Sequence, residues 1–187
     1  LRGRYNTISG VLYKGYGSFV TSPATVVAYS ENFDATSVGQ LPALWYLQSG
    51  TAGASAAKSV SAPNSVLIDG SGAVDSHARL ESEIATGVNV IFKVLYTLTG
   101  TDPLWSVSIQ SISGAWDATK LPISIGMNAA NTLYCSNGAT TETASAAFAA
   151  NTWYTIKIVP SITAQTYDLY IDNVLTKTGM VFSTPAA

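Results

Sequence analysis

Two runs near the end of the chain alternate between apolar and polar residues: WYTIKI at residues 153–158 and YDLYID at residues 167–172. A period of two places every second side chain on one face of a β-strand, so each run predicts a half-buried strand. Pro160, Ser161 and Thr163 lie between the runs and favour a loop. The two strands are therefore predicted to form an antiparallel hairpin, and this hairpin decides the fold class.

The same alternation extends toward the N-terminus. Residues 104–110 predict a strand with one apolar face, and residues 88–96 alternate in the same way. In the second run, Ile91 and Leu95 add apolar side chains to the outer face. Because both faces then carry apolar residues, we predict that this strand is central in its sheet and partly covered on both sides.

Turn signals recur at short intervals along the chain, at Asp69-Gly70, Ser113-Gly114, Asn137-Gly138 and Asn173. Many short strands between closely spaced turns predict an all-β fold, either a sandwich or a barrel. A helix is conceivable only in the Ala-rich segment 144–150, which is short and is followed by Asn151.

The composition excludes several classes of partner. The chain has 187 residues, enough for one domain, and a net charge of -2 without any basic cluster, which argues against nucleic acid and anionic membrane surfaces. No apolar run approaches the roughly 18 residues that span a bilayer, so no membrane insertion is expected. Charged residues make up 11% of the chain, and hydroxyl and amide side chains must hydrate the surface instead. This composition predicts an exported, extracellular protein or a virion surface component.

The first part of the chain differs in character from the rest. Residues 1–27 combine basic, aromatic and glycine residues, and we predict an N-terminal arm here that contains one or two strands. Residues 28–187 are then expected to form one antiparallel β-sandwich. No internal repeat is visible.

An ordered succession of short motifs follows the arm. The motifs are YSENFD at 29–34, GQLPALW at 39–45, SAPNSVL at 61–67, NTWYTIKI at 151–158 and YDLYIDN at 167–173. This succession, over residues 29–180, resembles the concanavalin A-like jelly rolls of the laminin-G-like kind. The resemblance implies two curved antiparallel sheets packed face to face, with Trp153 and Tyr154 near the core.

The sequence departs from that superfamily after the hairpin. Its members usually continue with a strand that returns beside the first strand, whereas here only a short run follows before Ala187. Since an uncovered strand edge promotes aggregation, one hypothesis is that the arm covers this edge, within its own subunit or in a neighbouring copy. The alternative is that residues 1–27 form an ordinary extra strand within their own subunit. The candidate self-assembly residues of the arm are Tyr5, Ile8, Val11, Tyr13, Tyr16 and Phe19.

The sequence offers no convincing catalytic centre. Glucanases of the resembling superfamily use three acids on one strand, but the nearest segment here, residues 77–83, has only Glu81 and Glu83. A Ser-His-Asp triad would need the single histidine, His77, and no Gly-x-Ser-x-Gly motif accompanies it. Asp168 and Asp172 are interpreted as part of a solvated strand surface. We therefore expect a protein that is not an enzyme.

Metal and thiol chemistry have little support. One histidine and one cysteine cannot build a structural zinc site. Cys135 is predicted to be a buried small apolar residue, and the alternative is a thiol that pairs with another molecule. Calcium is the one cofactor for which the sequence offers a set of ligands. Asp69, Ser71 and Asp75 could supply oxygen ligands in a loop, although the glycines between them are also explained by a tight turn.

Carbohydrate recognition is the remaining candidate. Trp116 and Asp117 place an aromatic ring and an acid in a predicted loop, and Asn128, Tyr134 and Asn137 lie in the next polar stretch. Trp116 could equally belong to the core. Two functions stay open: a non-catalytic module that binds glycan, or a structural subunit, such as a filament protomer or a phage decoration or fibre protein. In the second case the partner is another copy of the chain, in a homo-oligomer.

Overall fold

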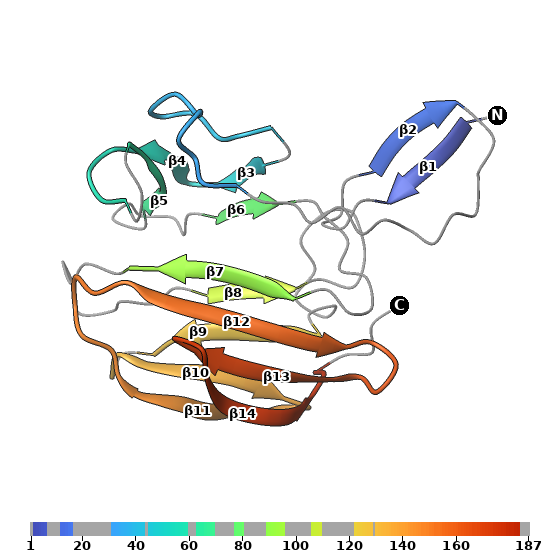
Figure 1. The fold of residues 1–187 in the computed structure, drawn as a ribbon, viewed down its shortest axis with the longest axis vertical. Helices are drawn as coiled ribbons and strands as arrows, with labels where there is room; N and C mark the ends of the chain where they lie inside the picture. Colours follow the sequence, from blue (N-terminus) through green and yellow to red (C-terminus); the bar gives the residue numbers. More distant parts are fainter. Residues whose placement is uncertain are drawn as a thin grey trace. The chain divides into compact units, whose positions relative to one another are not determined.

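The structure, a computed structural model, is built only of strands and turns in the part that it describes (Figure 1). It describes residues 2–6, 12–16, 31–43, 45–59, 63–69, 77–80, 89–95, 106–109, 122–128 and 130–183. Every pairing between the strands in these ranges is antiparallel. The all-β prediction is thus confirmed. These ranges contain no helix that is long and apolar enough to cross a membrane.

Contacts divide the chain into two compact units, Leu1–Ala85 and Thr86–Ala187. The strands of the first unit are β1 (Arg2–Asn6), β2 (Leu12–Tyr16), β3 (Trp45–Ser49), β4 (Thr51–Ser55), β5 (Ser65–Asp69) and β6 (His77–Leu80). They form three two-stranded sheets, β1-β2, β3-β6 and β4-β5. The predicted arm therefore contains two strands, whereas its predicted boundary at residue 27 lies outside the described residues.

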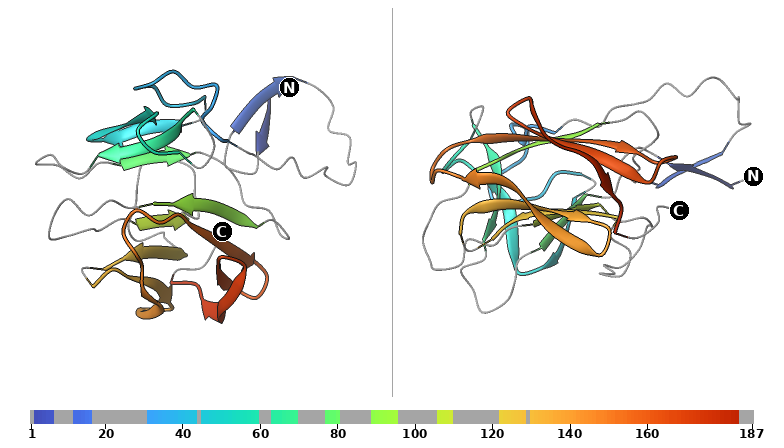
Figure 2. Two further views of the ribbon diagram at one scale, coloured as in Figure 1. Left: turned by 60° about the vertical axis from the view of Figure 1, so that its left-hand side comes forward. Right: turned by 90° about the horizontal axis from the view of Figure 1, so that it is seen from below.

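The second unit contains two sheets of four strands each, in the orders β11-β10-β9-β8 and β14-β13-β12-β7. Its strands are β7 (Val90–Val94), β8 (Ser106–Ile109), β9 (Ile123–Met127), β10 (Thr132–Asn137), β11 (Thr140–Ala147), β12 (Tyr154–Ser161), β13 (Thr166–Ile171) and β14 (Val174–Val181). Figure 2 shows the two sheets as facing layers.

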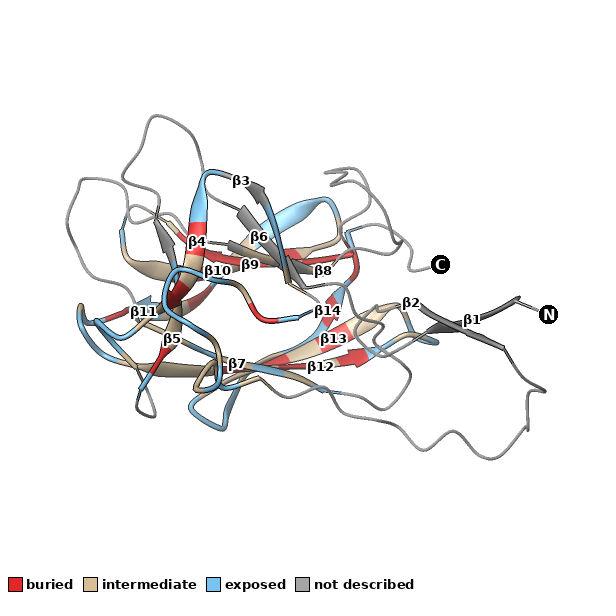
Figure 3. Ribbon diagram, turned by 90° about the horizontal axis from the view of Figure 1, so that it is seen from above, coloured by how far each residue is buried: buried red, intermediate tan, exposed pale blue. Residues whose placement is uncertain are grey.

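One hydrophobic core lies between these sheets. Ile125 and Leu133 from the first sheet and Ile158 and Leu169 from the second are completely buried members of the same cluster. Figure 3 colours the buried segments of the strands red. The alternating pattern of the sequence directs these side chains inward and their polar neighbours outward. The unit Thr86–Ala187 is therefore a β-sandwich.

The predicted hairpin is confirmed. Strand β12 pairs with β13 from Ile156↔Ile171 to Ser161↔Thr166, and the loop between them spans residues 162–165. Pro160 lies within β12, opposite Tyr167, rather than in the loop. The turn to β14 follows directly, with Asp172 and Asn173 at φ 48° and 66°. Asn and Asp tolerate this left-handed conformation better than most residues, which favours a two-residue turn.

One local prediction was wrong. Strand β7 ends its sheet among the described strands instead of occupying the centre, and Ile91 is 60% exposed. Residues 144–147 belong to β11 and not to a helix, because Ala144 is buried in the core and the strand pairs with β10. Tertiary burial overrides the helix propensity of alanine at this position. In addition, the short run after the hairpin forms β14, which pairs with β13.

Candidate functional site

Several predicted site residues lie outside the described residues. These are Trp116 and Asp117 of the glycan hypothesis, Ser71 and Asp75 of the calcium hypothesis, Glu81 and Glu83 of the acid pair, and Ile8, Val11 and Phe19 of the arm. Asp69 is the last residue of β5. Tyr5 and Tyr13 are register partners in the β1-β2 hairpin, and Tyr16 is the last residue of β2.

Asn128 has a structural role in the turn between β9 and β10. Its Oδ1 accepts hydrogen bonds from the backbone N–H groups of Ala130 and Thr132, at 3.0 and 3.1 Å. Such a side chain replaces a backbone partner and fixes the turn. Asn137 lies at the other end of β10, roughly 15 Å away at the rise of a β-strand. The structure therefore does not bring these two predicted ligands together.

Tyr134 lies on β10 between two core residues. Leu133 and Cys135 are completely buried, and Tyr134, which alternates with them, points to the outer face of the sheet and is half-buried. Its register partners are Gly126 on β9 and Thr143 on β11. The ring thus has a glycine on one neighbouring strand and a hydroxyl on the other.

The outer positions around Tyr134 share one property, which is the absence of charge. We call this surface the Tyr134 face, and its described residues are Ser124, Gly126, Thr132, Tyr134, Thr141 and Thr143. Within the described residues, the side-chain hydroxyls of Tyr134, Thr141 and Thr143 make no hydrogen bond. These three hydroxyls are consequently available to a ligand.

The outer face of the other sheet has a different chemistry. Lys157 Nζ lies 4.6 Å from the centroid of the Tyr170 ring, so a cation covers that ring. Asp168 accepts hydrogen bonds from the Thr178 hydroxyl and the Gly179 N–H, both at 2.8 Å. Asp168 therefore stabilises the pairing of β13 with β14. Among the described residues, no cation lies above the Tyr134 ring.

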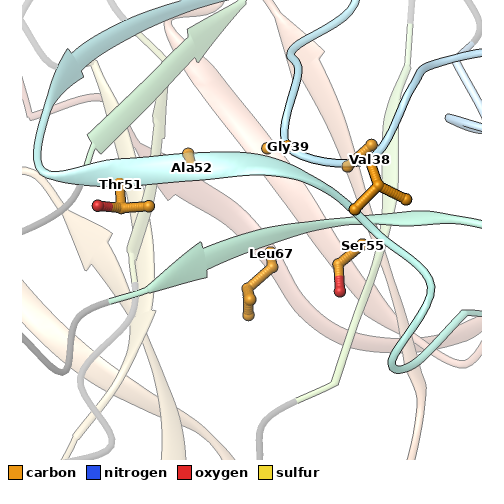
Figure 4. A pocket seen from close by; sticks show the side chains of 8 residues that line it. Val38, Gly39, Thr51, Ala52, Ser55 and Leu67 are labelled. Carbon is orange, nitrogen blue, oxygen red and sulfur yellow. The ribbon is translucent and has the colours of Figure 1, made fainter.

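A shallow hollow of about 240 Å³ lies beside β4 and β5 in the first unit (Figure 4). It is lined by Val38, Gly39, Thr51, Ala52, Gly53, Ala54, Ser55 and Leu67. Typical ligand pockets exceed about 300 Å³ and combine an apolar wall with convergent polar groups. This hollow is smaller, and no charged side chain lines it. We therefore assign it no ligand.

The described residues contain no group of three or more His, Cys, Asp and Glu side chains that could hold a metal ion. Cys135 is completely buried, as predicted. Burial raises the pKa of its thiol, although a hydrogen bond with Tyr167 partly offsets this effect. A raised pKa lowers the fraction of the nucleophilic thiolate, so this thiol is unsuited to nucleophilic catalysis.

A further polar cluster joins the two sheets of the sandwich at one edge. Lys177 on β14 forms an ion pair with Glu142 on β11, with 2.9 Å between Nζ and Oε2. Asn137 Nδ2 donates to Glu142 Oε1 at 2.5 Å, and Asn137 Oδ1 accepts from the Val181 N–H at 3.0 Å. The sequence predicted a turn at Asn137, but no local pattern predicted its hydrogen bond with Val181 on β14. We call these groups the edge cluster.

No family model matches the chain, and no curated protein or solved structure matches it either.

Proposed function

We propose that the chain is a non-catalytic recognition module that binds carbohydrate through the Tyr134 face. We further propose that its sandwich is a concanavalin A-like jelly roll of the laminin-G-like kind, exposed on an extracellular or virion surface. The order of motifs from residue 29 to residue 180 supports the superfamily, and the low content of charged residues supports the location.

The observation that carries this proposal is the Tyr134 ring on an uncharged, hydroxyl-bearing sheet face. A sugar ring has an apolar C–H face that stacks on an aromatic plane, and its hydroxyl groups exchange hydrogen bonds with short polar side chains. The Tyr134 face supplies both, because Thr141 and Thr143 lie on the next strand with unpaired hydroxyls in the described structure. Because Tyr134 lies on β10, a central strand of its sheet, the side chain loses little conformational entropy when a ligand binds.

A glycan array followed by titration tests the proposal. The intact protein is expected to bind a carbohydrate, and Tyr134→Ala is expected to weaken that binding about tenfold or more, which corresponds to about 1.4 kcal/mol. Tyr170→Ala is the matched control, because Tyr170 is a half-buried tyrosine on the opposite outer face. It should bind like the parent. Absence of glycan binding, or equal losses in both variants, would contradict the proposal.

A second function, that of a structural subunit, is favoured by one observation on the arm. Strands β1 and β2 pair only with each other among the described strands. An isolated two-stranded hairpin is at best marginally stable in water, so this hairpin needs a further surface. A neighbouring copy of the chain is the candidate partner, through the aromatic residues of the arm.

Removal of residues 1–16 tests this second function. If the arm joins subunits, light scattering should show the intact chain as an oligomer and the shortened chain as a monomer. An intact chain that remains a monomer at high concentration would rule the assembly out. A shortened chain that remains oligomeric would show that another surface joins the subunits.

A further inference from the structure

The edge cluster holds an amine and a carboxamide on a single carboxylate. Lys177 Nζ contacts Glu142 Oε2 at 2.9 Å, while Asn137 Nδ2 contacts Oε1 of the same group at 2.5 Å. The two oxygen atoms of one carboxylate are close neighbours, so the amine and the carboxamide are held near each other. The three side chains come from β14, β11 and β10, which belong to two different sheets.

The carbonyl oxygen of the same carboxamide has its own donor. The Val181 N–H donates to Asn137 Oδ1 at 3.0 Å. The Gly138 N–H in turn donates to the Val181 carbonyl oxygen at 2.8 Å, which fixes the end of β14 against the turn. The cluster therefore contains a nucleophile, a proton carrier, an amide with a potential leaving group, and a donor at the amide oxygen.

We propose that the edge cluster forms an intramolecular isopeptide bond between Lys177 and Asn137. The neutral amine of Lys177 attacks Asn137 Cγ, and a new C–N bond forms. The bond between Cγ and Nδ2 then breaks, and Nδ2 leaves as ammonia with a proton that Glu142 takes from the attacking amine. The reaction consumes no oxidant, reductant or other reactant, and its products are one amide and one ammonia molecule.

Each group has a defined role in this step. Glu142 is the catalytic residue, because it contacts both the attacking and the leaving nitrogen and can move a proton between them. The Val181 N–H stabilises the negative charge that develops on Asn137 Oδ1. The strands hold the reactants in place, and such positioning alone accelerates amide and ester chemistry by large factors.

Protonation of the amine limits the rate. The hydrogen bond with Glu142 raises the pKa of Lys177, and the other titratable group that acts on it among the described residues is the Cys135 thiol. Only the neutral amine attacks, and below its pKa the neutral fraction grows about tenfold for each unit of pH. The cross-link should therefore form slowly near neutral pH and faster in alkaline solution.

Intact mass spectrometry of the full chain tests the proposal, on fresh protein and after incubation near pH 9, which is about the onset of lysine deprotonation. The expected mass is lower than the sequence mass by one ammonia molecule. Proteolysis should then yield two peptides joined through Lys177 and Asn137.

Three variants sharpen this test. Lys177→Arg keeps the positive charge but lacks the amine nucleophile, so it should retain the full sequence mass. Glu142→Gln should slow the loss of ammonia at least tenfold. Lys157→Arg, which changes a lysine on the outer face of β12 that is not part of the edge cluster, should react like the parent chain. Circular dichroism confirms that each variant is folded.

Two results would overturn the proposal. One is a parent chain that keeps its full sequence mass after the alkaline incubation. The other is a loss of ammonia that leaves Lys177 free, as in a succinimide closed by the Gly138 nitrogen onto Asn137.

Discussion

Ile158→Ala is expected to lower the free energy of unfolding by about 3 kcal/mol. Ile158 is completely buried on β12, where its register partners are Val90 on β7 and Leu169 on β13. Truncation removes apolar contacts and leaves a cavity that rigid sheets on both sides fill only in part. Urea titration measures the loss as a lower midpoint with an unchanged slope.

Ile91→Ala is the matched control for this substitution. It makes the same chemical change on the neighbouring strand, but Ile91 is 60% exposed and lies on the outer face. Its effect is expected to stay within about 0.5 kcal/mol. Equal losses in the two variants would mean that β12 does not direct Ile158 into the core.

Gly53→Ala is expected to destabilise the first unit by about 2 kcal/mol. A Cβ at this position would lie 2.7 Å from the Gly39 carbonyl carbon, which is far inside van der Waals contact. The Gly39 backbone cannot easily move away, because its N–H donates to Ala54 O at 2.8 Å and the Ala54 N–H donates to Gln40 O at 2.7 Å. Hydrogen exchange of the Ala54 amide should be faster in the variant.

Gly138→Ala is the control for the glycine substitution. A Cβ there meets nothing within 4 Å, but φ is +57°, so the cost is about 1 kcal/mol of left-handed strain. That strain falls in the sandwich unit, and exchange of the Ala54 amide should not change. If Gly53→Ala leaves the Ala54 amide as well protected as in the parent chain, the close approach of Gly39 and Gly53 does not exist in solution.

Local patterns predicted the parts of the fold that depend on local physics. The alternation at residues 153–158 and 167–172 identified the correct faces, because a strand has a fixed period and each run has one apolar side. The prediction at Ile91 failed because burial depends on the neighbouring strands. An apolar residue on an outer face does not by itself show that the face is covered, and alanine is common in both strands and helices.

In the candidate site too, local patterns predicted some features, whereas contacts between distant strands decided the others. Tyr134 was named from its polar surroundings, and its position between Leu133 and Cys135 already predicts an outer face. Asn128 and Asn137 were named from the same polar surroundings, but their side chains form hydrogen bonds that stabilise a turn and the contact between strands. Glu142 and Lys177 are 35 residues apart in the chain, and only the meeting of two sheets brings them into contact.

The most direct test of the proposed function is the location of the bound carbohydrate. A glycan identified on the array is titrated into isotope-labelled protein, and the amide shift changes are mapped onto the sequence. The largest changes are expected at Tyr134, Thr141 and Thr143. Changes concentrated around Lys157 and Tyr170 on the opposite sheet would contradict a binding site on the Tyr134 face.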